Sequence, residues 1–339
     1  MPSFSRAVRG DVGLIVVLSG GTGSGKTMSA LRLAQGIVGR AGTFALIDTE
    51  SGRARHYAPR AGEEPNFVDS FRFDHCDLRA PFAPLAYTEA IRAADSAGYP
   101  VIVVDSLSHV WAGDGGVLDA HESELDRMAG EDERKREACK MAAWVRPKME
   151  HKSMVQRLLQ VRAHLVLCLR AEEKIEMIRE DGRLKVIPKR SLAGHDGWVP
   201  VCEKSLPFEA TCSFMLLASE PGVPVRIKLQ LQHHGIFPPD QRIDETCGER
   251  LLAWASGAAA PPVVTIDAEQ LDELVRLITE NRIDRATYRD WLKLPDLASL
   301  PAARYEAVRK GLLSRLARTH PAPQESPEPE TVSPVETGT

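Results

Sequence analysis

Short apolar runs alternate with longer amphipathic segments along the first third of the chain. The apolar runs predict strands at 12–19, 43–48, 70–74 and 101–105. The segments between them predict helices at 26–39, 53–60 and 84–97. Strands that alternate with helices in this way are typical of a parallel sheet with crossover helices. We therefore expect an α/β fold in which helices flank a mostly parallel sheet.

The middle of the chain has a different pattern. Polar and apolar residues alternate from 173 to 188 around Asp181-Gly182, which is a strong signal for a β-hairpin. The dense mixed charges within 114–140 indicate a solvated helical excursion or a mobile loop. A helix is expected at 148–161, with a buried face made of Met149, Met154, Leu158 and Val161. The remaining expected elements are strands at 164–169, 212–218 and 224–231 and a helix at 247–256.

Composition divides the chain into four parts. The core domain is expected at 1–257, and a run of small residues and prolines predicts a linker at 258–264. A helical stripe of apolar residues then predicts a C-terminal helical module at 265–318. The Pro-, Ser-, Thr- and Glu-rich residues 319–339 predict a disordered acidic tail. Since this tail holds four Glu and no Lys or Arg, the net charge of −4 leaves the rest of the chain neutral, and a nucleic-acid surface would have to be local.

A phosphate-binding loop is the strongest chemical signal. Residues 20–27 read Gly-Gly-Thr-Gly-Ser-Gly-Lys-Thr and match the pattern G-x-x-x-x-G-K-[ST] between a predicted strand and a predicted helix. Glycines let backbone amides approach phosphates, and the helix N-terminus adds positive potential. Lys26 is expected to reach the β- and γ-phosphates, and the Thr27 hydroxyl to bind Mg²⁺. The residues expected to bind the nucleotide are Gly20, Gly21, Thr22, Gly23, Ser24, Gly25, Lys26, Thr27 and Met28.

A second acidic motif fits the same chemistry. Residues 101–104 are four apolar residues, and Asp105 follows them directly. In a phosphate-loop ATPase this is the Walker B pattern, in which an Asp at the end of a central strand holds Mg²⁺. Thr27 and Asp105 are therefore the expected metal-binding residues, and ATP and Mg²⁺ are the expected ligands.

The segment that ends in Glu50 resembles the RecA family. This segment is Ile47-Asp-Thr-Glu50, just beyond a predicted strand. RecA-like cores have Ile-Asp-x-Glu at this place, and the resemblance implies that Glu50 acts as a general base on the attacking water. The alternative is a surface cap before Arg53. Asp48 is interpreted as structural, or as a residue that acts on the metal indirectly.

Two further segments resemble one particular group of RecA-like proteins. Residues 80–91 contain Pro-Phe-Ala-Pro, and residues 97–111 end in Asp-Ser-Leu-Ser-His-Val-Trp. Together with the phosphate loop, they resemble the phage-type AAA/RecA-like nucleotide-binding family, which includes single-strand annealing ATPases, over roughly residues 10–256. The resemblance implies a RecA-like P-loop ATPase core and a role in phage or prophage DNA recombination or annealing. It also implies single-stranded DNA and a phage recombination or single-strand-binding protein as partners, and a homo-oligomer.

Basic residues beyond the phosphate loop have several interpretations. The predicted strand that follows the Walker B motif ends in Arg170, whereas the corresponding strand of RecA ends in a Gln. The phage-type resemblance implies that Arg170 senses the γ-phosphate and stabilises transition-state charge. An ion pair with Glu172 or Glu173 is the alternative. Lys185, Lys189 and Arg190 lie on or beyond the hairpin. Lys189 and Arg190 are candidates for insertion into a neighbour's ATP site, while binding of DNA phosphates and a plain solvated hairpin are the other two interpretations.

Several other classes of protein find little support. No apolar run approaches the ~20 residues that span a bilayer, and the polar N-terminus lacks a signal-peptide core, so a cytoplasmic protein is expected. The six cysteines form no C-x-x-C pair and are expected to be buried thiols. His109 and Trp111 are interpreted as packing residues, and His233-His234 as no metal site. The main alternative function is a nucleotide-dependent protein-interaction switch without DNA. A kinase is disfavoured because no Arg-rich lid follows.

Overall fold

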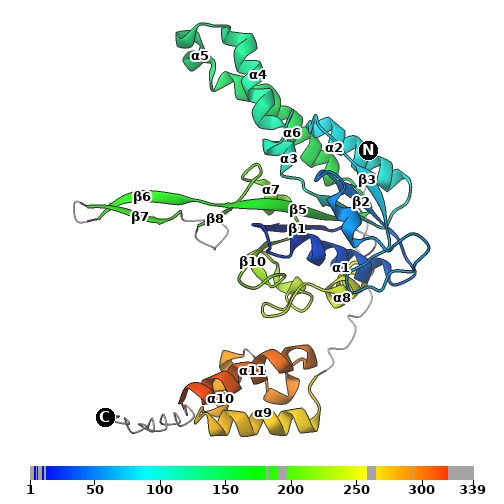
Figure 1. Ribbon diagram of the computed structural model, residues 1–339, viewed down its shortest axis with the longest axis vertical. Coiled ribbons are helices and arrows are strands. Elements are labelled where there is room, and N and C mark those ends of the chain that lie inside the picture. Colours follow the sequence, from blue (N-terminus) through cyan, green and yellow to red (C-terminus); the bar gives the residue numbers. More distant parts are fainter. Residues whose placement is uncertain are drawn as a thin grey trace, which may run out of the picture. The chain divides into compact units, whose positions relative to one another are not determined.

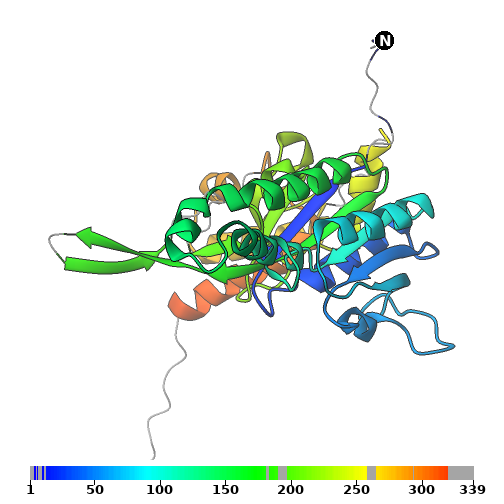
Figure 2. The same ribbon diagram turned by 90° about the horizontal axis from the view of Figure 1, so that it is seen from above.

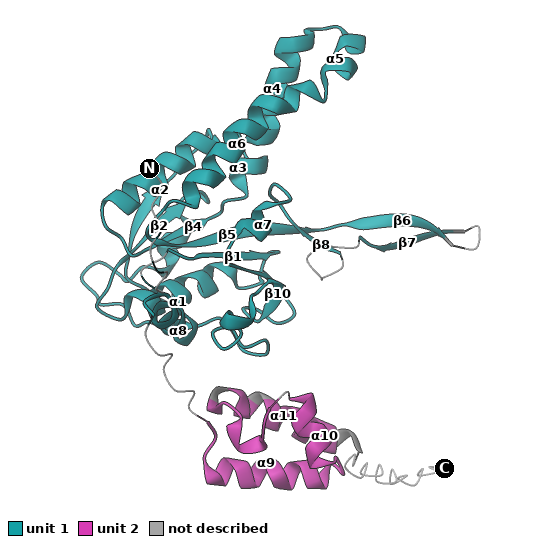
Figure 3. Cartoon of the chain, turned by 180° about the vertical axis from the view of Figure 1, so that it is seen from behind, with its two compact units in different colours: residues 1–261 teal, residues 262–339 magenta. Residues whose placement is uncertain are grey.

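The computed structural model describes residues 4, 6, 10, 13–180, 183–189, 197–257, 265–292 and 294–319 of the chain. It has two units, residues 1–261 and residues 262–339 (Figure 3). Each unit has its own hydrophobic core, so each is described by itself. The predicted linker 258–264, Arg190, the Asp181-Gly182 turn and residues 320–339 of the predicted tail lie outside the described residues.

A mostly parallel sheet forms the centre of unit 1 (Figure 1). Its strands follow the order β10-β9-β1-β5-β4-β2-β3, and β8 pairs with the far end of β5. Only β10 and β8 run antiparallel to their neighbours. The predicted α/β fold, in which helices flank a mostly parallel sheet, is confirmed. The strands are β1 Ile15–Gly20, β2 Phe44–Asp48, β3 Phe73–Asp77, β4 Val101–Asp105, β5 His164–Glu173, β8 Trp198–Pro200, β9 Cys212–Leu216 and β10 Pro224–Lys228.

The predicted bounds of a strand agree best with the structure where the whole strand is buried. All residues of β2, β4 and β9 are buried, because helices cover both faces of the sheet, and such strands are continuous apolar runs. The edge strand β3 alternates between half-buried and exposed residues, and it covers 73–77 rather than the predicted 70–74. The predicted strand began too early because Phe71 is apolar and fully buried. Its amide donates to Tyr57 O rather than to a neighbouring strand, so Phe71 is not part of β3.

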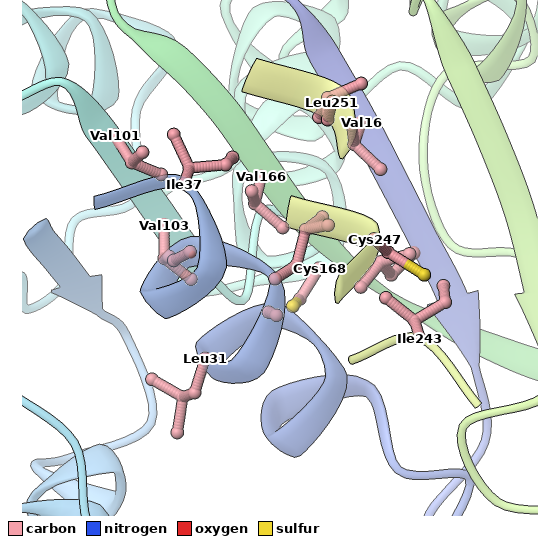
Figure 4. Close-up of a cluster of buried hydrophobic side chains, with 14 of the residues drawn as sticks. Val16, Leu31, Ile37, Val101, Val103, Val166, Cys168, Ile243, Cys247 and Leu251 are labelled. Atoms are coloured by element: carbon pink, nitrogen blue, oxygen red, sulfur yellow. The ribbon is translucent and has the colours of Figure 1, made fainter. Parts of the chain in front are cut away.

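Two hydrophobic clusters lie on the two faces of the sheet. On one face α1 and α8 pack against the strands, and Figure 4 shows Leu31 and Ile37 of α1 in the same cluster as Cys247 and Leu251 of α8. On the other face α2 and α6 cover the same strands. The helices of unit 1 are α1 Lys26–Val38, α2 Pro84–Ser96, α3 His109–Ala112, α4 Val117–Ala129, α5 Glu133–Cys139, α6 Val145–Leu158, α7 Leu206–Glu209 and α8 Glu245–Ala255, with 3-10 turns η1 Arg53–Tyr57, η2 Ala142–Trp144 and η3 Leu231–His233.

The helices α1 and α8 touch through their backbones. A Cβ atom on Gly36 would lie 2.0 Å from the carbonyl oxygen of Glu245, which no real side chain could tolerate. The guanidinium of Arg32 also donates to both carboxylate oxygens of Glu245, from Nε to Oε1 at 2.8 Å and from Nη2 to Oε2 at 2.6 Å. The helix that follows the phosphate loop is therefore fixed along its length by a segment from the end of unit 1.

Three expectations for unit 1 need correction. The predicted helix at 53–60 is only the 3-10 turn η1. Met149 is exposed rather than buried, because the buried side of α6 includes Pro147 and His151 before it reaches Met154 and Leu158. Of the cysteines, which were all expected to be buried, Cys76 is exposed and Cys139 and Cys202 are only half-buried. Cys168, Cys212 and Cys247 are buried as expected, and Figure 4 shows the first and the last of these three in the core.

Two predicted features project from unit 1. The charged segment 114–140 forms α4 and α5, which extend from the body as a helical arm, in agreement with the predicted excursion (Figure 1). The predicted hairpin is confirmed as β6 Ile175–Glu180 and β7 Arg183–Pro188, a separate two-stranded antiparallel sheet.

Unit 2 is helical, with α9 Ala268–Glu280, α10 Arg285–Trp291, the 3-10 turn η4 Leu297–Ser299 and α11 Ala302–Thr319. Asp267 and Gln270 form a reciprocal capping box at the start of α9. Leu274 and Ile278 of α9 are fully buried in a core that α11 completes. Thr319, which the sequence assigned to the tail, is the last residue of α11. Across the described residues of both units, no helix combines the length and apolarity needed to cross a bilayer.

Candidate nucleotide site

The carboxyl ends of β1, β2, β4 and β5 meet at one edge of the sheet, where a cavity of about 880 Å³ opens. Ligands of open α/β sheets bind outside these strand ends. All the residues that the sequence predicted to bind the nucleotide or Mg²⁺, or to act in catalysis, lie around this one cavity. The cavity is lined by Gly20, Gly21, Thr22, Gly23, Ser24, Gly25, Lys26, Thr27, Met28, Glu50, Asp105 and Arg170.

The phosphate loop is held in shape by its own backbone and by the β9–β10 turn. Gly25 has φ +83°, a left-handed conformation that side chains disfavour, and an added Cβ would lie 2.9 Å from Gly222 N. Gly222 N in turn donates to Ser24 O at 2.9 Å. The buried Ser24 hydroxyl donates to Gly21 O at 2.8 Å. The loop is thus ordered from both sides by contacts that need no ligand.

Lys26 begins α1 and lies over the loop. Its Nζ donates to Gly21 O at 2.9 Å, so the ammonium group is already turned into the loop. The N-terminal amides of a 13-residue helix lie beside it, and such a terminus attracts anions. A flexible ammonium above a helix N-terminus is well suited to phosphate oxygens.

Asp105 is a buried carboxylate with one hydroxyl partner. Its residue is 7% exposed, and Thr27 Oγ1 donates to its Oδ2 at 2.5 Å. Burial raises the pKa of Asp105 to about 6, although the Thr27 bond opposes that rise. An electrostatically unfavourable carboxylate of this kind gains from a nearby cation.

The donors at this place fit Mg²⁺. Thr27 and Asp105 supply the hydroxyl and carboxylate oxygens that this hard cation prefers. In the described part of the chain no three His, Cys, Asp or Glu side chains converge to hold a metal on their own. That is expected of Mg²⁺ sites that combine one or two protein groups with substrate phosphates.

Asp48 ends β2 and is in register with Asp105 of β4, yet it is used differently. Its Oδ1 accepts from Glu50 N at 2.6 Å, and its Oδ2 accepts from Ala54 N at 2.9 Å. His75 Nε2 lies 3.1 Å from Oδ2. The Asp48 carboxylate therefore folds the backbone that carries Glu50 toward the cavity, which agrees with its structural interpretation.

Glu50 and Arg170 form an ion pair inside the cavity. Glu50 Oε1 accepts from Arg170 Nη2 at 2.7 Å and from Nε at 3.2 Å, while Oε2 accepts from Arg53 Nη1 at 3.2 Å. Burial alone would raise the pKa of Glu50, but the hydrogen bonds and charge of Arg170, helped by Arg53, hold it below its ordinary value. The alternative of an ion pair between Arg170 and Glu172 or Glu173 is wrong. Arg170 binds Glu50 instead, which follows the carboxyl end of β2.

Sequence reasoning missed a group that links the strand ends. Thr49 Oγ1 donates to Ser106 O at 2.9 Å and accepts from Ser106 N at 2.8 Å, which ties β2 to β4. The same hydroxyl lies 2.8 Å from His109 Nδ1, and His109 lines the cavity. Burial, reinforced by the charge of Arg170, lowers the pKa of His109. The only signal in the sequence was the polar cluster that directly follows each apolar strand.

The remaining candidate residues have other surroundings. Trp111 stacks on Trp144 with ring centroids 6.1 Å apart, which agrees with the packing interpretation. His109 packs at a tilt on Phe82 with ring centroids 5.0 Å apart, but it also lines the cavity, so packing describes only part of its surroundings. Lys185 belongs to β7 and Lys189 directly follows it; neither lines the cavity. The roles considered for them and for Arg190 stay predictions.

The comparison with known families decides the classification. The AAA domain family matches residues 13–191, which is more than half of the chain. The chain belongs to the AAA domain family. Together with the phosphate loop, this membership makes unit 1 a nucleotide-binding domain of the ATPase type.

None of the curated proteins matches this AAA-domain chain. Among solved structures, the KaiC-like protein PH0186 from the hyperthermophilic archaeon Pyrococcus horikoshii is similar at 16% identity, covering 62% of this chain and 81% of that one. Its TM-score is 0.31, so this likeness carries no argument about function.

Proposed function

We propose that this protein binds Mg·ATP and hydrolyses it by attack of water on the γ-phosphate. The observation that carries the proposal is the position of Glu50, which lines the same cavity as the phosphate loop and the Thr27–Asp105 pair. A carboxylate opposite the phosphate loop suits water activation. Lys26 and the loop amides would hold the phosphates, and Thr27 and Asp105 would hold Mg²⁺, which supplies charge neutralisation when bound.

Glu50 and Arg170 have complementary roles in this proposal. Since the pKa of Glu50 is lowered, its carboxylate is charged at neutral pH and accepts a hydrogen bond from water. A γ-phosphate competes with that carboxylate for the guanidinium of Arg170, because both are anions within its range. Arg170 would then stabilise charge on the transferring phosphoryl group while Glu50 is released to orient the water.

Two substitutions test this assignment in an assay of phosphate release and nucleotide binding. Lys26→Ala is expected to lower turnover by at least ~100-fold and to weaken ATP binding, because the loop loses its only ammonium group. Glu50→Gln is expected to bind ATP normally and to hydrolyse it ~100-fold or more slowly, since an amide cannot act as the base. Retained turnover in Lys26→Ala contradicts the proposed site.

A matched control separates local from general effects. Glu63→Gln changes an exposed glutamate that pairs with Arg60 at 4.0 Å, and we expect wild-type turnover from it. If Glu50→Gln behaves like Glu63→Gln, then Glu50 is a surface cap and another group activates the water.

We further propose that the ATPase acts on single-stranded DNA in recombination or annealing, as the resemblance implied. Unit 2 supports this partner. Trp291 is 70% exposed and stacks on Tyr288 with ring centroids 5.4 Å apart. Burial raises the pKa of Tyr288, while the positive charges of Arg315 and Arg304 oppose that rise, so the aromatic pair stands in a locally positive field. Exposed aromatic faces next to arginines suit unpaired bases and their phosphates.

The DNA partner is tested by ATP hydrolysis with and without single-stranded DNA across a salt series. Stimulation that weakens as salt rises, and that Trp291→Ala reduces, is the expected result. Leu313→Ala, another exposed apolar residue of unit 2, is the control and should leave stimulation unchanged. Absence of both stimulation and DNA binding would favour the alternative, a nucleotide-dependent protein-interaction switch.

A further inference from the structure

His109 lines the nucleotide cavity and has no part yet in the proposed hydrolysis. It is the first residue of α3, the short helix that follows β4. Its ring packs against Phe82, and its Nδ1 lies 2.8 Å from Thr49 Oγ1. Thr49 directly precedes Glu50, so this contact joins the ring to the backbone beside the proposed base. The histidine is thus held on the cavity wall from two sides.

The backbone that carries His109 is anchored to β5. Leu107 N donates to Cys168 O at 2.9 Å, and Arg170 N donates to the buried hydroxyl of Ser108 at 2.8 Å. Both β5 residues lie where that strand still pairs with β1, before the chain leaves the main sheet as the β6–β7 hairpin (Figure 1, Figure 2). The support of α3 therefore belongs to the sheet itself, which is the rigid part that a precise site needs.

The hydrogen bonds of Thr49 determine which nitrogen of His109 carries the hydrogen. A threonine hydroxyl has one hydrogen to donate and two lone pairs that accept. Ser106 N can only donate, and it donates to Thr49 Oγ1 at 2.8 Å. Ser106 O can only accept, and it takes the single hydroxyl hydrogen at 2.9 Å. The second lone pair of Thr49 is left for His109, so Nδ1 carries a hydrogen and donates it.

The opposite tautomer is unfavourable. If Thr49 donated to His109 Nδ1, no hydrogen would lie between Thr49 Oγ1 and Ser106 O, and two oxygens would face each other at 2.9 Å. Thr49 and Ser106 are both buried, where such a contact is costly. Burial, reinforced by the charge of Arg170, also lowers the pKa of His109, which keeps the ring neutral at neutral pH. Nε2 is therefore a bare acceptor, and it is the ring nitrogen left for ligands of the cavity.

We propose that His109 Nε2 accepts a hydrogen bond from the water that attacks the γ-phosphate. The inference rests on the proposed function and adds a second acceptor beside Glu50. A water that donates one hydrogen to Glu50 and the other to Nε2 turns its lone pairs toward the phosphorus. Its oxygen bonds to phosphorus while the bond to the bridging oxygen breaks, and ADP leaves with that electron pair. One proton passes to Glu50, and the other stays on the product phosphate.

Two substitutions separate the two nitrogens of His109. An Asn amide nitrogen takes the place of Nδ1, which keeps the bond to Thr49 and removes the acceptor. A Gln amide reaches the place of Nε2, which keeps an acceptor and removes the bond to Thr49. We expect His109→Asn to lower kcat for ATP about tenfold with KM unchanged, as one lost hydrogen bond implies. His109→Gln should retain more of kcat. Phosphate release by the full chain is measured at about pH 8, because a proton on Nε2 would remove the acceptor.

A double variant tests whether Glu50 and His109 hold the same water. Residues that act together lose activity non-additively, so Glu50→Gln/His109→Asn should turn over as fast as Glu50→Gln alone. A further loss of about tenfold in the double variant would show that His109 acts separately, and would overturn the proposal. Wild-type kcat in His109→Asn, or a larger loss in His109→Gln than in His109→Asn, would also overturn it, since the ring would then act only through Thr49.

The same assay distinguishes failure of this inference from failure of the proposed function. If Lys26→Ala and Glu50→Gln lose turnover while His109→Asn does not, only the inference about His109 fails. If Lys26→Ala turns over like the wild type, the proposed function fails and the inference fails with it. His234→Asn, at a histidine that does not line the cavity, should behave like the wild type. Chemical denaturation of each variant shows whether the fold is retained, and His109→Asn is expected to keep it.

Discussion

Asp48 and Asp105 end adjacent strands in direct register, and yet their surroundings differ. Asp48 accepts hydrogen bonds from two backbone amides and lies beside His75, so the protein itself satisfies its carboxylate. Asp105 is almost as buried, but Thr27 is its one hydrogen-bond donor among the described contacts. A carboxylate that binds two backbone amides shapes the backbone, whereas one with a single hydroxyl donor has an oxygen left that suits a cation. The same residue type therefore has a structural role in one strand and a proposed chemical role in the next.

The substitution Asp105→Asn is expected to have the largest effect. Loss of the carboxylate removes a Mg²⁺ ligand, so turnover should fall at least ~100-fold while the free energy of unfolding stays the same or rises, because a buried charge is removed. Turnover measured over a Mg²⁺ series and chemical denaturation check both parts. A destabilised variant would show that Asp105, like Asp48, supports the fold.

The matched substitution Asp48→Asn should act on stability. An amide offers one acceptor oxygen where the carboxylate offered two, so either Glu50 N or Ala54 N loses its partner. We expect the free energy of unfolding to fall by ~2 kcal/mol, with a smaller loss of turnover than in Asp105→Asn. Denaturation curves of the two variants, compared with the wild type, measure the difference. Equal stability of all three proteins would remove the distinction.

The pH dependence of turnover sharpens the comparison at Glu50. Arg170 holds the pKa of Glu50 below its ordinary 4.5, so the charged base persists to low pH in the wild type. Arg170→Gln should therefore move the acidic limb of the pH profile of kcat/KM to higher pH, since that limb follows ionisation of the base. Arg53→Gln, which removes the weaker partner, should move it less. Because burial raises the pKa of Asp105 to about 6, the profile is measured at saturating Mg²⁺, which keeps Asp105 charged. An acidic limb that does not move under this condition would mean that Glu50 is not the base.

His75→Leu should have the smallest effect. The substitution removes one polar partner from Asp48 Oδ2 and leaves both backbone amides in place. We expect a loss of ~1 kcal/mol or less in the free energy of unfolding and unchanged turnover. Chemical denaturation of His75→Leu is measured in parallel with that of Asp48→Asn. An equal loss in the free energy of unfolding in both variants would mean that His75 contributes as much to stability as the Asp48 carboxylate.

The sequence predicted the parts of the site that depend on local pattern. The phosphate loop and Asp105 stand next to strands whose burial on both faces makes them continuous apolar runs. The partner of Arg170 was not predictable, because it depends on the order of strands in the sheet, which brings the ends of β2 and β5 to one cavity. The exposure of Met149 was missed for a related reason: the buried side of α6 includes a histidine, which a purely apolar pattern passes over.

The position of β1 within the sheet has a consequence for how the protein is made. Ile15 pairs with Leu165 on one side and Val16 pairs with Cys212 on the other, and α1 rests on α8. The strand that leads into the phosphate loop is thus synthesised long before the two strands that it pairs with. Such distant pairings form slowly and late. A chain released early carries the complete phosphate-loop motif and still has no nucleotide site.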